Sequence, residues 1–236
     1  MAVWHRFEVQ KGLKMKLISV NVGLPREVTW KGKAVRTGIF KEPVNSRVMV
    51  RELNLDGDRQ ADLTVHGGVD KAVYVYPFEH YDYWRSELPD TELTLGIFGE
   101  NFTVTGLREE ELNIGDRFKI GSVKLMVTQP RLPCYKLGIR FGRSDMVKRF
   151  LASRRTGFYF RVLQEGEVGV GDTLELVSRD TNNITVADIT QLYMREQNNP
   201  ELLHRAARLE ALPESWRDYF QEQIRQSPSG GEKDKG

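Results

Sequence analysis

Short stretches in which hydrophobic and polar residues alternate dominate the chain up to about residue 178. They are rich in β-branched and aromatic residues and are separated by Gly, Asp and Asn, a pattern that predicts β-strands. The predicted strands cover residues 16–22, 46–53, 72–76, 101–106, 117–120, 123–129, 157–164 and 173–178. Two segments, EELNIGDRFKI and GEVGVGDTLEL, share an apolar–Gly–Asp turn that leads into an alternating strand. Many short, turn-separated strands of this kind predict a barrel or a strongly curved sheet.

Two stretches with helical features interrupt the predicted strands. The first, residues 77–88, opens with Pro77, which suits a first helical turn because the missing N–H would have no partner there. The second, residues 144–153, has Ser144 placed as its N-cap. We expect the aromatic residues of FEHYDYWRSEL to pack the first helix onto the strands, the alternative being that they line a pocket.

After Ser178 the pattern becomes helical. Thr185 can cap a helix through ADITQLYMRE, and NNPELLHRAARLEAL and PESWRDYFQEQIRQ follow, each with a proline near its first turn. Their apolar residues recur at helical spacing, at Leu202, Leu203, Ala206, Leu209, Trp216, Phe220 and Ile224. The predicted organisation is an N-terminal extension, a strand-rich domain with inserted helices, a three-helix unit and a disordered tail, over residues 1–15, 16–180, 181–226 and 227–236.

The composition is that of an ordinary globular protein, since 39% of the 236 residues are hydrophobic and 29% are charged. The first residues lack the apolar run of about 7–15 residues found in secretory signals, and no stretch approaches the ~18 apolar residues of a membrane span. The single cysteine cannot form an internal disulfide, which agrees with a reducing compartment. We therefore expect a cytoplasmic protein with no membrane partner.

The positive charge is unevenly distributed along the chain. The segment 131–161 has one acid, Asp145, and nine basic residues, namely Arg131, Lys136, Arg140, Arg143, Lys148, Arg149, Arg154, Arg155 and Arg161. Its net charge is therefore +8, and because the whole chain carries +2, the remainder carries −6. A local basic segment on a near-neutral protein indicates a defined anionic ligand rather than nucleic acid, whose binders are basic as a whole.

The only cysteine, Cys134, lies inside this basic segment, in QPRLPCYKLGIRFGR. A lone cysteine is most often a small buried hydrophobic residue. Here Arg131 and Lys136 flank the cysteine, and YKLGIRF predicts a short helix that begins directly after it. Nearby cations and a helix start lower the pKa of a thiol, and the thiolate is the nucleophilic and metal-binding form. The setting favours a functional thiol.

A second candidate site is DLTVHGGVDKAVY, where a predicted strand runs into His66, Gly67 and Gly68 before Lys71. The paired glycines fit either a hairpin turn or a backbone nest for phosphate. No GxxxxGK[ST] or GxGxxG motif is present. Zinc is disfavoured because the chain lacks CxxC and HExxH and its four histidines are scattered. A Cys–His pair formed with His66 stays open.

Four segments in order resemble the MOSC family, named for the C-terminal domain of molybdenum-cofactor sulfurase. They are DLTVHGGVDKAVYVYPFEHY, GIFGENFTVTGL, LNIGDRFKIGSVKLMVTQPRLPCYKLG and TGFYFRVLQEGEVGVGD. The helical unit after Ser178 resembles the extension of the YiiM subgroup, the hydroxylaminopurine resistance proteins. The resemblance implies a mixed α+β fold, a MOSC-type β-barrel flanked by helices with a C-terminal three-helix unit.

The resemblance also implies a cofactor and a reaction. Cys134 would ligate the molybdenum of a pyranopterin dithiolene cofactor, and the reaction would reduce N-hydroxylated compounds, such as 6-N-hydroxylaminopurine to adenine. Anionic groups of that cofactor match the basic segment. The expected cofactor or substrate contacts are Lys41, His66, Gly67, Gly68, Lys71, Asn101, Arg131, Lys136, Arg155 and Arg161. Gly157 and Tyr159 lie close by in the sequence, and a purely structural role stays open for both.

Several alternatives remain at the level of sequence. The chain has no flavin, nicotinamide or iron–sulfur motif, so a separate electron-donor reductase is the expected partner of such an enzyme. A carrier of the molybdenum cofactor or of sulfur, with a persulfide on Cys134 and no turnover of its own, would use the same residues. A homo-oligomer stays open. Nucleic acid is disfavoured as a partner because the rest of the chain is acidic.

Overall fold

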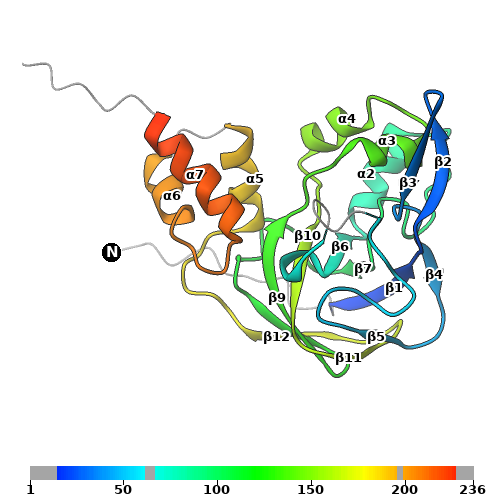
Figure 1. Cartoon of the computed structure of the whole chain (residues 1–236). Coiled ribbons are helices and arrows are strands. Elements are labelled where there is room, and N and C mark those ends of the chain that lie inside the picture. Colours follow the sequence, from blue (N-terminus) through cyan, green and yellow to red (C-terminus); the bar gives the residue numbers. More distant parts are fainter. Residues whose placement is uncertain (1–14, 62–66, 196–198, 227–236) are drawn as a thin grey trace, which may run out of the picture.

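The computed structural model describes residues 15–61, 67–195 and 199–226 (Figure 1). Its largest element is an eight-stranded sheet with the order β12-β8-β9-β10-β6-β7-β1-β4. The strands are β1 (Lys16–Val22), β4 (Glu42–Val44), β6 (Val73–Pro77), β7 (Phe102–Thr105), β8 (Arg117–Ile120), β9 (Val123–Pro130), β10 (Phe158–Gln164) and β12 (Leu174–Ser178). Neighbouring strands are antiparallel except for the parallel pair β6 and β7.

The sheet is not closed into the barrel that the sequence analysis expected. Its two ends are β12 and β4, and β4 has Pro43 at its centre, which lacks an N–H for a further strand to pair with. β1, the neighbour of β4, meets the start of β12 through an isolated bridge between Lys16 and Thr173. Register shifts along β10, as at bulges, bend the sheet strongly without closing it. The fold is therefore mixed α+β with an open, curved sheet.

The repeated Gly–Asp turn of the sequence forms the same structure twice. Gly115 and Gly171 both have a positive φ, which disfavours other residues there. The side chain of Asp116 accepts a 3.0 Å hydrogen bond from the N–H three residues before it, and Asp172 accepts an equivalent bond of 2.9 Å. Each turn leads into one strand of the pair β8–β12, so the sequence repeat starts two neighbouring strands.

Two smaller sheets accompany the large one. β2 (Arg26–Trp30) and β3 (Lys33–Thr37) form an exposed hairpin that sequence analysis missed, and β5 (Val48–Val50) pairs with β11 (Gly166–Val168). The predicted strand over residues 46–53 was too long, since only its central part pairs. β2 and β3 were missed because they bury little and their hydrophobic alternation is short, extending over only a few residues in each strand.

The helices lie in two separate groups, one next to β6 and the other beside β9 (Figure 1). The first group contains α2 (His80–Glu87), α3 (Tyr135–Phe141) and α4 (Met146–Ser153), and the second contains α5 (Val186–Met194), α6 (Pro200–Ala206) and α7 (Glu214–Gln226). A short 3-10 helix, η1 (Val69–Lys71), precedes β6. No helix within the described ranges has the length and apolar character needed to cross a membrane.

The helix starts partly match the sequence predictions. Thr185 caps α5 through a full capping box with Asp188, as expected for a cap residue. Pro77 instead ends β6, and α2 starts at His80, because the strand, which is buried along its whole length, continues through the proline. Asp145, not Ser144, is the N-cap residue of α4.

The buried side chains form two clusters. The larger one lies on the sheet and includes the apolar faces of α5, α6 and α7, so these helices share the core of the strand domain. The smaller one is aromatic and joins β6 to α2 and α4. In it, Trp84 donates a 2.6 Å hydrogen bond to the hydroxyl of Tyr76, whose ring stacks on Phe98 at 4.4 Å. The predicted packing of the aromatic residues of α2 onto the strands is confirmed.

Candidate functional site

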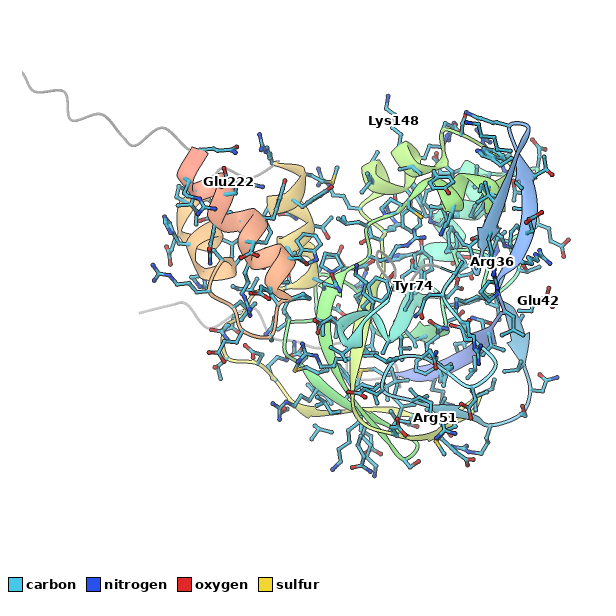
Figure 2. All side chains as sticks on the ribbon, viewed as in Figure 1. Arg36, Glu42, Arg51, Tyr74, Lys148 and Glu222 are labelled. Carbon is cyan, nitrogen blue, oxygen red and sulfur yellow. The ribbon has the colours of Figure 1, made fainter. Side chains whose placement is uncertain are left out.

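A cavity of about 100 Å³ lies where β6, η1 and the start of α3 meet. The lining residues come from six separate parts of the chain and are Thr37, Gly38, Ile39, Lys41, Arg59, Gln60, Ala61, Lys71, Tyr74, Gly99, Asn101, Arg131, Leu132, Cys134, Lys136 and Tyr159. Figure 2 shows Tyr74 in the interior of the strand domain. Six of the residues that the sequence singled out therefore meet in one place, namely Lys41, Lys71, Asn101, Arg131, Cys134 and Lys136.

Cys134 reaches this cavity at the junction between β9 and α3. Pro133 precedes it, and its extended backbone (φ −115°, ψ 173°) makes it the N-cap residue of α3, as the sequence indicated. Its carbonyl oxygen accepts a 2.9 Å hydrogen bond from the N–H of Leu137. The cysteine is partly buried, so the sulfur is neither sealed in the core nor fully exposed. This is the setting of a thiol that a ligand in the cavity can contact.

Arg131 is the most deeply buried cation of the site, with 6% of its surface exposed. Its guanidinium lies 5.1 Å from the ring centre of Tyr74 and 5.0 Å from that of Phe150. Nη2 donates a long 3.5 Å hydrogen bond to the carbonyl oxygen of Phe98, whereas Nη1 is buried with no hydrogen-bond partner among the described residues. An unpaired buried donor costs roughly 1–3 kcal/mol, so an acceptor in the cavity would stabilise this arrangement.

Lys41 and Asn101 are held by a buried acid that sequence analysis missed, Asp58. The ammonium of Lys41 pairs with the carboxylate of Asp58, which also accepts a 2.9 Å hydrogen bond from Nδ2 of Asn101. The other end of that amide is used as well, because Oδ1 of Asn101 accepts a 3.1 Å bond from the N–H of Tyr74. Both residues therefore shape the wall of the cavity more than they offer charge to a ligand.

Lys71 ends η1 on the cavity wall, and burial lowers its pKa below the ordinary 10.5, although Asp70 opposes the shift. The N–H of Lys71 donates a 3.0 Å hydrogen bond to the carbonyl oxygen of Gly68. Gly68 has a φ of 103°, so the chain turns there without a side chain. Gly67 and Gly68 position η1 and do not line the cavity. His66, a further predicted contact, lies outside the described residues.

Arg155 and Arg161 were also expected at the site, and the structure places neither in the cavity lining. The guanidinium of Arg155 lies 4.1 Å above the ring centre of Tyr83. Arg161 forms an ion pair with Asp70, with Nε 2.7 Å from the carboxylate. Both cations are engaged by partners far away in the sequence.

The other charges of the basic segment are also dispersed. Arg143 and Arg149 pair with Asp145, and Arg140 lies against the ring of Phe40. Figure 2 shows Lys148 pointing away from the ribbon. The expected concentration of nine cations around the thiol is therefore not observed. The cavity instead combines Arg131 and Lys136 with Lys41, Arg59 and Lys71 from elsewhere in the chain.

Two tyrosines form the aromatic part of the wall. The rings of Tyr74 and Tyr159 lie 5.3 Å apart, and the hydroxyl of Tyr74 donates a 2.9 Å hydrogen bond to the carbonyl oxygen of Thr156. Burial raises the pKa of both hydroxyl groups, so both remain neutral. The residues AVYVY predicted a strand but did not indicate that the side chain of Tyr74 lines a site.

The chemistry of the described lining is that of an anion site with a thiol. It contains basic residues and neutral residues but no aspartate or glutamate. Among the described residues no group of three or more His, Cys, Asp or Glu could hold a metal ion. A metal at this site would therefore need ligands of its own, with Cys134 as an added one, and the anionic end of such a group would lie beside Arg131, Lys71 and Lys136.

Comparison with known proteins identifies the family. The MOSC domain matches residues 62–175, and the YiiM-like, 3-alpha helix domain matches residues 184–226. Protein YiiM of Escherichia coli (strain K12) is 37% identical over 182 residues, which cover 76% of this chain and 81% of that protein. The chain belongs to the YiiM-like MOSC proteins. The resemblance stated from the sequence is confirmed.

Two further relatives and a solved structure extend the comparison. YflK of Bacillus subtilis (strain 168), described as uncharacterized, is 44% identical over 207 residues, 88% of this chain and 93% of that protein. A Gibberella moniliformis protein named Reductase is 32% identical over 84% of this chain but only 35% of its own length. The crystal structure of YiiM from Geobacillus stearothermophilus has a TM-score of 0.75 at 36% identity and covers 89% of this chain and 99% of that one.

Proposed function

We propose that this YiiM-like protein is a molybdenum-cofactor-dependent reductase of N-hydroxylated compounds, for which 6-N-hydroxylaminopurine is the model substrate. One observation carries the proposal: Cys134 shares a cavity with basic residues and no described acid, and the buried Nη1 of Arg131 has no described partner there. Membership of the MOSC family and the name of the Gibberella moniliformis relative, Reductase, support it.

The residues present fit a pyranopterin dithiolene cofactor. Nη1 of Arg131 would donate to an anionic oxygen or sulfur, which would satisfy its missing hydrogen bond. Lys71 and Lys136 would add positive charge, and the thiolate of Cys134 would be the soft protein ligand of the metal. When bound, the cofactor supplies the two-electron chemistry. The cavity of about 100 Å³ is below the ~300 Å³ usual for ligand pockets, so we expect it to hold one end of the group only.

The proposed reaction breaks the N–O bond of a hydroxylamine. R–NHOH takes up two electrons and two protons and yields R–NH₂ and water. The electrons come from a separate reductase, because the sequence carries no flavin, nicotinamide or iron–sulfur motif. We assign Nζ of Lys71 as the donor of the proton to the leaving oxygen, because its lowered pKa makes it a stronger acid than an exposed lysine. The rings of Tyr74 and Tyr159 would exclude water from one wall.

The test is metal and pterin analysis of the full chain, purified from a host that synthesises the cofactor. We expect about one molybdenum and one pterin per chain of the wild type. The variant Cys134→Ser should lose the metal and the reduction of hydroxylaminopurine. Serine is a favourable N-cap residue, so this variant should fold. Wild-type protein without molybdenum, or unchanged turnover by Cys134→Ser, would reject the proposal. A labile sulfur adduct on Cys134 without turnover would assign the carrier role instead.

A further inference from the structure

A second cavity, of about 760 Å³, lies between the strand domain and the C-terminal helices. One wall consists of parts of β8 and β9 and of the segment 178–182 after β12, and the other of α6 and residues 208–211 beyond it. Ligand pockets typically measure ~300–1,000 Å³ and form preferentially where structural units meet. The size and the place of this cavity are therefore those of a small-molecule site.

Two arginines of this cavity are fixed in place. Arg179 donates a 2.7 Å hydrogen bond to the carbonyl oxygen of Glu111 and pairs with Asp116 at 3.2 Å. Arg205 on α6 donates to the carbonyl oxygen of Asn182, which ties the helix to the opposite wall. Guanidinium groups that are held in this way lose less side-chain entropy when they bind a ligand.

Two further arginines line the same cavity, Arg117 on β8 and Arg208 just beyond α6. Both residues are exposed, and neither guanidinium has a hydrogen-bond or ion-pair partner among the described residues, although the backbone N–H of Arg208 donates to the carbonyl oxygen of Arg205. They belong to opposite walls of the cavity, Arg117 to the sheet and Arg208 to the helical unit. A guanidinium fork matches a phosphate group in geometry as well as in charge, and two forks suit a group with three free oxygens better than a carboxylate with two.

The remaining lining residues limit what can bind. Asp180 and Glu210 reduce the net charge of the lining from the +4 of its arginines to +2. Asp180 is occupied locally, because its carboxylate accepts two 2.8 Å hydrogen bonds from Asn182. Met126 and Leu209, at 7% and 4% exposure, add a small apolar surface beside the arginines. A long polyanion would meet the two acids, whereas a small molecule with one phosphate and an apolar part would meet matching groups.

We propose that this cavity binds a phosphorylated small molecule of about the size of a mononucleotide. The phosphate lies between Arg117 and Arg208, and the organic part lies against Met126 and Leu209. The proposal is independent of the proposed function, because it uses no residue of the Cys134 cavity.

Isothermal titration of the full chain with adenosine 5′-monophosphate, and separately with inorganic phosphate, tests the proposal. We expect saturable binding of the nucleotide at one site per chain, tighter than that of phosphate. The double variant Arg117→Gln/Arg208→Gln should weaken it by at least about tenfold, the effect of losing one charge-assisted hydrogen bond. The control is Arg225→Gln, near the end of α7, because Arg225 is exposed, pairs with Glu222 and lies outside the cavity lining; it should bind as the wild type does.

The outcomes separate the two cavities. No nucleotide binding, or equal binding by wild type and double variant, would overturn the proposal. Nucleotide binding that is unchanged in the double variant but lost in Lys71→Met would also overturn it, because the nucleotide would then bind in the Cys134 cavity. Equal affinity for phosphate and nucleotide would overturn the contact with the organic part. If circular dichroism shows the double variant unfolded, Arg208→Gln alone decides, with an expected loss of about tenfold, because it still removes one charge-assisted hydrogen bond.

Discussion

The indole Nε1 of Trp216 on α7 donates a 2.6 Å hydrogen bond to Oε1 of Gln129 on β9. Nε2 of the same glutamine donates a 3.1 Å bond to the carbonyl oxygen of Asp70, the residue before Lys71. Trp216 and Gln129 are buried, at 7% and 2% exposure. The C-terminal helices are thus connected by two hydrogen bonds to the short helix that brings Lys71 to the Cys134 cavity.

The variant Trp216→Phe should lower the free energy of unfolding by roughly 1–3 kcal/mol, because it leaves the buried Oε1 of Gln129 without its donor. It should also increase the labelling rate of Lys71 by an amine reagent, followed by peptide mass spectrometry. Trp30→Phe on the exposed hairpin is the control for the loss of an indole. Equal labelling of Lys71 in all three proteins would show that the helical unit does not position it.

The lowered pKa of Lys71 predicts a pH dependence of stability. The folded pKa lies below the unfolded value of 10.5, so between the two the unfolded chain holds a proton that the folded chain has released. The free energy of unfolding contributed by this lysine therefore rises with pH through that window. Lys71→Met removes the contribution, and urea titrations from pH 7 to pH 10.5 measure the difference between the proteins. A difference that matches that of Lys148→Met, at an exposed lysine, would contradict the prediction.

The unpaired Nη1 of Arg131 predicts that this residue contributes to ligand binding more than to folding. Arg131→Met keeps an apolar stem among the aromatic rings, so we expect the free energy of unfolding to change by less than about 1.5 kcal/mol. Pterin fluorescence of the purified variant should fall at least tenfold, because its anion contact is lost. Arg131→Lys, which keeps the charge but not the fork, should retain an intermediate amount. Full pterin retention by Arg131→Met would be the contrary result.

A close backbone approach beside the cavity gives a further prediction. A Cβ at Gly38 would overlap the carbonyl oxygen of Arg59, and both residues line the cavity. Gly38→Ala should therefore separate these two segments and destabilise the fold by about 1–3 kcal/mol in thermal or urea unfolding. At Gly169 the added atom would meet the flexible side chain of Arg47, so Gly169→Ala is the control and should change stability by less than about 0.5 kcal/mol.

The sequence predicted the elements that enter the core. β10 was found from the alternation of its buried face, and β6 and β9 were found from β-branched and apolar residues that are buried on both faces. α5 was found from the capping residue Thr185. The β2–β3 hairpin escaped because its side chains bury little. The prediction that the sheet closes was wrong. Alternation determines which face of a strand is buried, whereas closure depends on pairing between the strands at the two ends of the sheet.

The site could be predicted where its residues are neighbours in the sequence. PRLPC placed Arg131 and Cys134 together, and the helix after it brought Lys136 to the same wall. Asp58 was missed because nothing in its local sequence shows that it meets Lys41, 17 positions earlier. Arg161 was expected at the cavity, yet its partner Asp70 lies 91 positions away. Ion pairs between residues that are distant in the sequence neutralise charged side chains, and the sequence alone does not show this pairing.

The bridge between β1 and the start of β12 has a consequence for how the chain folds. The N–H of Leu17 donates to the carbonyl oxygen of Asp172, 155 positions later, and the N–H of Leu174 donates to that of Met15. Contacts of such high sequence separation slow folding, because a long loop must close before they form. A nascent chain that has not yet released Leu174 from the ribosome leaves β1 incompletely paired, so the sheet can be completed only late in synthesis.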